Sequence, residues 1–194
     1  RGISFNLGPY YRYTTDAISR FKFLNDSGVS TASYVNFEKE TSKGFSFNLN
    51  FTNLLNRKLR LIFSGSIFWD EINTDIFGSD NYDNTSQGER LRTNIMWNIN
   101  ETTEMMFFMF YMPERDIAIG KMGSMSWSAL SFKKKLFDKK LDVSIKYGDP
   151  FNLTGFHFET YGDNWSQITN RYFNSQITTI SFNYRFGKIE DKSS

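Results

Sequence analysis

Apolar and polar residues alternate along the stretch QITTISFNYRFGK at residues 176–188. The apolar positions are Ile180, Phe182, Tyr184 and Phe186, and the polar positions between them are Thr179, Ser181, Asn183 and Arg185. Side chains of a β-strand point alternately to opposite faces, so this segment has one apolar and one polar face. Such a strand fits a soluble sandwich, with the apolar face inward, or a membrane barrel, with that face toward lipid.

The same period-two pattern recurs along the whole chain. It predicts strands at residues 3–13, 45–52, 59–70, 90–98, 104–112, 127–137, 141–148 and 176–188. Segment 104–112 (EMMFFMFYM) is apolar on both faces, which suggests that a plug, a cluster in the lumen or a partner chain covers its second face. Segment 127–137 alternates less cleanly. We therefore expect about eight antiparallel strands and an all-β fold.

The connections between these strands alternate in length. Short turns are predicted at residues 54–58, 98–102 and 137–140, and long, mostly polar connections at 14–43, 73–88, 113–126 and 148–173. Short turns at one end and long loops at the other are typical of outer-membrane barrels, whose short turns face the periplasm. A soluble sandwich has no reason to sort its connections in this way.

The polar and aromatic positions favour the barrel as well. The polar face carries mainly Ser, Asn, Thr and Gly with a few Arg, whereas the surface of a soluble sandwich would be rich in Lys and Glu. Trp69 and Trp127 fall at the loop ends of their strands, and Trp97, Tyr184 and Phe186 fall at the turn ends. This placement predicts two aromatic girdles. The pattern therefore indicates an antiparallel transmembrane β-barrel.

Composition narrows the range of functions. The 194 residues suffice for one domain, and a net charge of +2 gives no electrostatic footprint for nucleic acid. The absence of cysteine excludes disulfides, thiolate metal sites and a cysteine nucleophile. No run of about 18 apolar residues exists, so we expect no transmembrane helix.

Three stretches resemble a known family. They are YYRYTTDAISRF (10–21), SYVNFEKETSKGFSFNLNF (33–51) and ISFNYRFGKIEDKSS (180–194). Together they resemble the C-terminal barrel region of large outer-membrane β-barrel proteins of Bacteroidota related to TonB-dependent receptors, and the resemblance covers nearly the whole chain. Those proteins carry a regulatory-like domain, a plug domain and a barrel of about 22 strands. The resemblance implies barrel strands at residues 1–186 and a polar periplasmic tail at 187–194.

The resemblance also implies a function in the bacterial outer membrane. We expect part of the wall of a solute uptake pore of TonB-dependent receptor type; the alternative is a small structural or accessory barrel that associates with other membrane proteins. The strands fit a small closed barrel or part of a larger wall, and the contiguous resemblance favours the larger wall. Expected partners are outer-membrane lipid, a plug domain or further strands from missing sequence or another chain, and the barrel assembly machinery, but not nucleic acid. Phe182, Tyr184 and Phe186 resemble the C-terminal insertion signal of such barrels.

Five basic residues share the polar side of their strands and are the candidate binding residues. They are Arg60, Arg90, Arg92, Lys146 and Arg185. In a barrel lumen they would steer an anionic solute, contact a plug, or form ion pairs with acids such as Asp142 and Asp70.

Catalytic and metal sites are not expected. The single histidine, His157, has Ser166 or Asp163 as possible partners, but no nucleophile motif surrounds any serine, so we expect no enzyme. An acidic cluster matches no calcium loop by its spacing, and we expect no metal and no cofactor. The cluster comprises Asp70, Glu71, Asp75, Asp80 and Asp83.

Overall fold

The computed structural model describes residues 2–24, 29–74, 82–117, 120–162 and 165–186. The strands are β1 (Ile3–Leu24), β2 (Ser30–Leu54), β3 (Leu59–Thr74), β4 (Tyr82–Asn100), β5 (Thr103–Met112), β6 (Arg115–Ile117), β7 (Gly120–Met122), β8 (Met125–Leu136), β9 (Leu141–Gly148), β10 (Gly155–Gly162), β11 (Trp165–Tyr172) and β12 (Thr178–Tyr184). An eight-stranded sheet has the order β1-β2-β3-β4-β5-β8-β9-β12, and a four-stranded sheet has the order β11-β10-β7-β6. Every paired neighbour is antiparallel, which confirms the all-β antiparallel fold.

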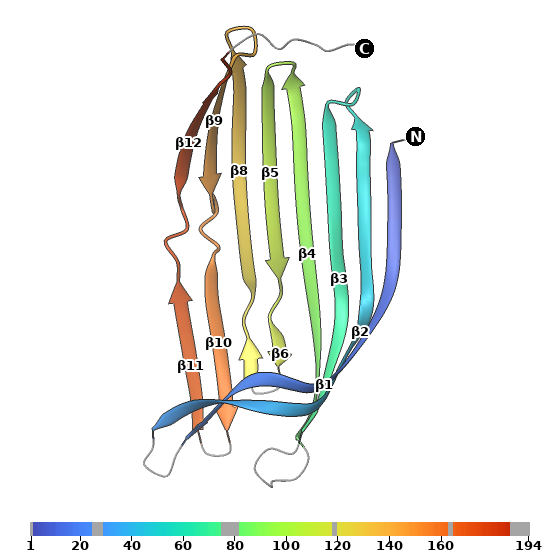
Figure 1. Cartoon of the computed structure of the whole chain (residues 1–194), viewed down its shortest axis with the longest axis vertical. Coiled ribbons are helices and arrows are strands. Elements are labelled where there is room, and N and C mark those ends of the chain that lie inside the picture. The colour runs from blue at the N-terminus through green and yellow to red at the C-terminus, as the bar shows by residue number, and fades with distance from the viewer. Residues whose placement is uncertain (1, 25–28, 75–81, 118–119, 163–164, 187–194) are drawn as a thin grey trace.

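The smaller sheet continues the larger one. Figure 1 shows β6, β7, β10 and β11 prolonging β5, β8, β9 and β12 beyond short interruptions. The expected long loops at 113–126 and 148–173 are therefore largely strand, and the expected loop at 14–43 is mostly the outer half of β1 and β2. These predictions were wrong because the alternation in these segments is confined to short runs, such as Phe156 to Glu159, which did not suffice to predict strands.

The predicted turns are confirmed. They join β2 to β3, β4 to β5 and β8 to β9 at the end of the sheet where β1 begins and β12 ends (Figure 1). In two of them three successive residues have positive φ: Leu55, Asn56 and Arg57 (49°, 56° and 67°), and Phe137, Asp138 and Lys139 (51°, 51° and 67°). Asn and Asp adopt this left-handed conformation more readily than most residues, which fits their place in these turns.

The strand registers align the apolar residues into one continuous face. Leu49 is paired with Phe63, and Val143 with Phe182. These side chains are turned outward rather than into a core, since Phe182 is 70% exposed. In the described part of the chain the buried hydrophobic residues are Phe68, Met112 and Ala129. An apolar surface therefore takes the place of an apolar core.

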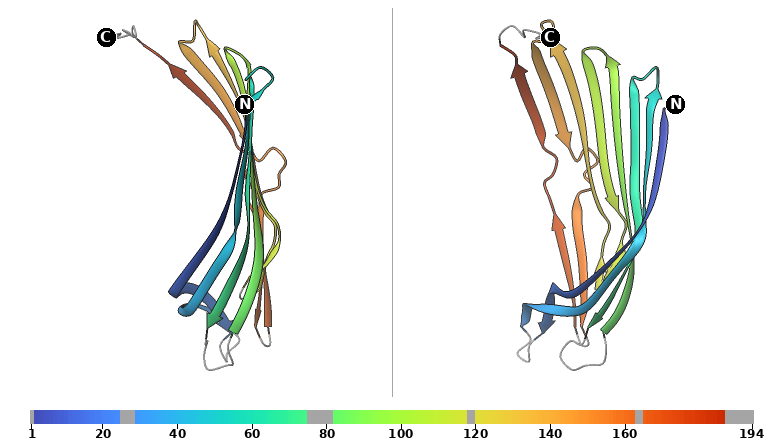
Figure 2. Two further views of the ribbon diagram at one scale, coloured as in Figure 1. Left: turned by 90° about the vertical axis from the view of Figure 1, so that its right-hand side faces the viewer. Right: turned by 45° about the vertical axis from the view of Figure 1, so that its right-hand side comes forward.

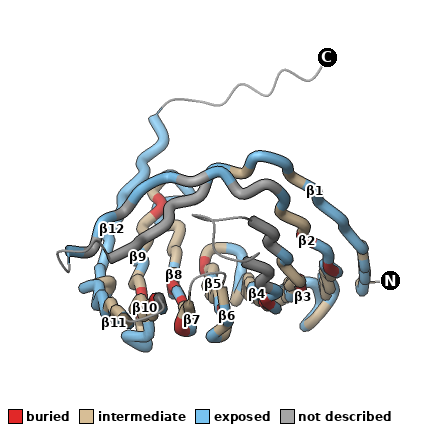
Figure 3. Tube along the Cα trace, turned by 90° about the horizontal axis from the view of Figure 1, so that it is seen from below, coloured by how far each residue is buried: buried red, intermediate tan, exposed pale blue. Residues whose placement is uncertain are grey.

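The sheet is an open arc (Figures 2 and 3). Its edges are β1 and β12, and the outer parts of β1 and β2 bend across the concave side. Arg115 of β6 reaches Asp70 of β3, with β4 between these two strands. Inward curvature brings side chains two strands apart closer together, so this contact fits a polar face on the concave side.

One member of the predicted girdles lies on the other side. Trp127 is paired with Phe110, and its ring lies near Phe108 and Lys146 of the concave face. Its assignment to the loop-end girdle was therefore wrong. The alternation of 127–137 was weak because this strand carries Lys134 among its outward residues and Ala129 among its inward ones.

The C-terminal residues are described only in part. Phe182 and Tyr184 belong to β12, and Phe186 is 88% exposed just beyond it. Their role as an insertion signal stays a prediction. The expected tail, 187–194, lies outside the described residues.

Candidate functional site on the concave face

The concave face is built around one buried ring. Phe68 is 2% exposed, and its register partners on the two neighbouring strands are Gly44 and Gly88. A Cβ atom on Gly88 would lie 2.3 Å from Cζ of Phe68, so the ring covers this glycine directly. Covering a strand glycine with a cross-strand aromatic ring stabilises a β-sheet. Phe68 shares the face of Ser66 and Asp70, and the two glycines leave space for an apolar ring among these polar residues.

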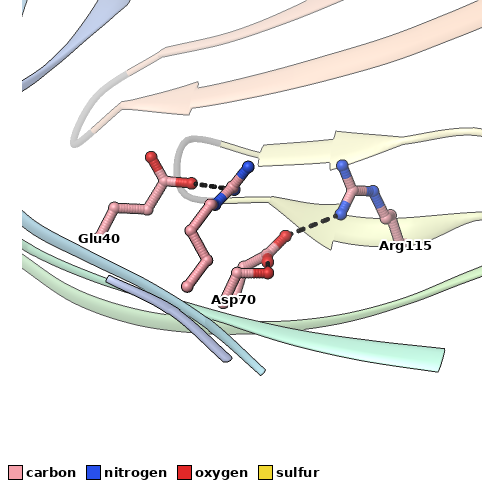
Figure 4. A network of polar contacts seen from close by, with 5 residues as sticks. Glu40, Asp70 and Arg115 are labelled. Atoms are coloured by element: carbon pink, nitrogen blue, oxygen red, sulfur yellow. Dashed lines mark hydrogen bonds and ion pairs between the residues drawn. The ribbon is translucent and has the colours of Figure 1, made fainter. Parts of the chain in front are cut away.

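Two guanidinium groups lie over this ring. The Cζ atom of Arg90 is 4.6 Å from the ring centroid of Phe68, and that of Arg115 is 5.1 Å from it. Arg115 also forms an ion pair of 3.3 Å with Asp70, which accepts a 2.7 Å hydrogen bond from Ser42 (Figure 4). Sequence reasoning missed Arg115 because it was placed in a loop.

A second ion pair belongs to the same network of polar contacts. Arg12 of β1 lies 3.0 Å from Glu40 of β2 (Figure 4). This pair joins the two strands shortly before their outer parts bend across the concave side. Its energetic contribution is small, because the side chain of Arg12 is exposed.

A second group of rings lies beside the first. Arg92 is 5.7 Å from the ring centroid of Phe110, and Lys146 is 5.7 Å from the ring of Trp127. Phe108 lies 5.2 Å from Trp127. These contacts explain why segment 104–112 is apolar on both sides: its inner residues form a lumenal aromatic cluster with cations above it.

The five predicted lumenal cations fall into two groups. Arg185 forms a 3.0 Å ion pair with Asp142, which also lies 3.5 Å from Lys133. The other four form no ion pair with any described carboxylate, and all four are exposed. They are Arg60, Arg90, Arg92 and Lys146.

A polar groove runs beside Arg90 and Arg92. Its volume is about 480 Å³. Small or polar residues of the first three strands line it, among them Asn6, Gly8, Ser46, Asn48, Ser64 and Ser66. Small side chains leave the groove open, and their hydroxyl and amide groups offer hydrogen bonds.

His157 lies apart from this groove, on β10. Its Nδ1 atom is 2.5 Å from Oδ1 of Asn170 and its Nε2 atom is 3.0 Å from Oε1 of Glu159. The hydrogen bonds with Asn170 and Glu159 raise the pKa of His157 above its ordinary value. Ser166 is paired with Tyr161 instead, and Asp163 lies outside the described residues. Both described partners of the imidazole ring are therefore an amide and a carboxylate, and Ser166 is not among them.

The acidic cluster is only partly described. Asp75 and Asp80 lie outside the described residues, as does the side chain of Asp83. Asp70 is occupied by Arg115 and Ser42. Within the described residues no group of three or more His, Asp or Glu is placed to hold a metal ion. No helix in that part of the chain is long and apolar enough to cross a membrane.

Comparison with known proteins gives one match. Residues 1–184 match the model of a family described as the outer membrane protein beta-barrel family. Neither a curated protein nor a solved structure matches the chain.

Proposed function

Because the chain belongs to the outer membrane protein beta-barrel family and is located in the bacterial outer membrane, we propose that it forms part of the wall of a solute uptake pore of TonB-dependent receptor type, as found in Bacteroidota. Lipid contacts the apolar face, and the concave polar face lines the solute path. The resemblance of the chain to the barrel region of such receptors supports this type. The described residues carry no catalytic role in it.

The main observation in support of this proposal is that the sheet is an open arc. In hydrocarbon each unsatisfied backbone N–H or C=O group costs several kcal/mol, so β1 and β12 need partner strands within the membrane. A wall of further strands supplies these partners without changing the curvature of the arc. The partner strands belong to the same polypeptide or to another chain, and a plug domain occupies the enclosed space.

The proposal predicts energy-dependent uptake. The outer membrane has no energy source of its own, so a receptor of this type depends on the TonB protein that transmits energy from the inner membrane. We expect deletion of the gene, and separately deletion of TonB, to reduce uptake of the same solute to background. The measurement is uptake by whole cells of a panel of labelled anionic and neutral solutes.

A solute that enters through a passive porin is the control, and its uptake stays unchanged in both strains. Uptake that depends on the gene but not on TonB would contradict the receptor type. Uptake that depends on neither, with loss of other membrane proteins from the outer membrane, would favour a structural or accessory barrel.

A further inference from the structure

Arg90 and Arg92 stand on one strand, two positions apart. Both belong to β4 and face the concave side, since their register partners Ser66 and Ser64 line the groove there. Two residues of a strand span about 7 Å. The pair therefore presents two guanidinium groups side by side to the lumen.

The rings hold both groups in place. Arg90 stacks on Phe68 and Arg92 on Phe110, which restricts the freedom of long side chains. A guanidinium whose orientation is fixed loses less entropy when it binds a carboxylate or a phosphate through paired hydrogen bonds. Arg115, the third cation near Phe68, is already occupied by Asp70.

Among the described residues no ion pair compensates the charge of these two arginines. No described carboxylate forms an ion pair with Arg90 or Arg92, and both are exposed. The adjacent groove of about 480 Å³ has room for a small solute. Ser46, Ser64 and Asn48 add neutral hydrogen-bonding groups around it.

We propose that this groove is a binding site for small solutes with two anionic groups, carboxylate or phosphate, one for each guanidinium. The proposal rests on the proposed function, because it assigns a substrate class to the same lumen. The shared chemistry is a pair of oxyanions, and the hydroxyl and amide groups bind the uncharged part of the solute.

Calorimetric titration of the full polypeptide, purified from the outer membrane, tests this site. The probes are succinate, pyrophosphate and, as a neutral solute, maltose, all at one low ionic strength. We expect the anions to bind and maltose not to bind, and the stronger anion identifies carboxylate or phosphate as the preferred group. Arg90→Gln and Arg92→Gln each weaken binding about tenfold, and the double variant about a hundredfold.

Two further variants separate a specific site from a general positive field. Arg92→Lys keeps the charge but loses the fork of donors, so binding weakens although the net charge is unchanged. Arg57→Gln removes one charge from the exposed turn between β2 and β3, and leaves affinity unchanged.

Three results would overturn the site. The first is that neither anion binds. The second is that Arg57→Gln weakens anion binding as much as the substitutions of Arg90 and Arg92 do. The third is that the double variant binds the anions unchanged while the rest of the polypeptide becomes more sensitive to protease. The last result identifies an internal acidic segment as the occupant. TonB-dependent uptake of a solute without two anionic groups would contradict this site alone, and leave the uptake function standing.

Discussion

Replacing Ile180 with Lys is expected to destabilise the folded barrel by about 2–4 kcal/mol. Ile180 is 57% exposed, and its register partner is Ile145 on the apolar face. If that face contacts acyl chains, the substitution places an ammonium group in hydrocarbon, where its hydration is lost. Reversible unfolding by denaturant in lipid bilayers measures the change in free energy.

Ser181→Lys is the matched control. Ser181 directly follows Ile180, is paired with Ser144 and belongs to the polar face. The same ammonium group then reaches the lumen, so we expect a change of less than about 1 kcal/mol. Equal destabilisation by both substitutions would show that the two faces do not differ in environment.

Replacing Phe68 with Ala is expected to cost about 3 kcal/mol or more. This ring is the most completely buried large apolar side chain described, and it covers Gly88 and supports the guanidinium groups of Arg90 and Arg115. Its removal leaves a cavity and takes away the ring beneath both guanidinium groups. The measurement is the free energy of unfolding, in the same bilayers.

A double-mutant cycle tests whether the ring acts through the glycine. Gly88→Ala places a Cβ atom 2.3 Å from the present position of Cζ of Phe68, so the ring must move and the protein loses about 1–3 kcal/mol. In the Phe68→Ala background the same substitution meets no ring and is nearly neutral. Additive effects of the two substitutions would contradict the packing of Phe68 on Gly88.

Alternation predicted the membrane-spanning half of the fold well. A register shift of one residue would move every side chain of a strand to the opposite face. The apolar residues of four neighbouring strands all lie on one face, and this sets the register between them. Examples are Leu49, Phe63, Ile95 and Phe107. The short turns were also predictable, because Asn56 and Asp138 are residue types that favour turns. The sequence pattern sufficed wherever lipid and tight turns restrict the choice of residue.

The extensions beyond the membrane could not be predicted in this way. In β6, β7, β10 and β11 the alternation is confined to short runs, such as Phe156 to Glu159, which are too short to predict strands of this length. Interruptions between β5 and β6 and between β9 and β10 also break the phase. Arg115 was missed for this reason, although it is the partner of Asp70.

The alternating pattern predicted which face carries the basic residues of the candidate site, but not which residues they contact. Parity placed Arg90, Arg92 and Lys146 on the polar face, where the structure has them. Their contacts are with aromatic rings rather than with carboxylates. These rings belong to Phe68, Phe110 and Trp127, which are apolar residues at positions of the polar face. Such exceptions in an alternating strand are the signal that points to a lumenal site.

The most direct measurement of the central claim is the accessibility of spin labels along β3 in the bilayer. The chain has no cysteine, so single cysteines introduced from residue 59 to residue 69 each carry one label. We expect labels at Leu61, Phe63 and Ile67 to be accessible to oxygen dissolved in lipid, and those at Ser64 and Ser66 to a water-soluble nickel chelate. Accessibility without a two-residue period, or with the two sets exchanged, would contradict the claim that the apolar face contacts lipid.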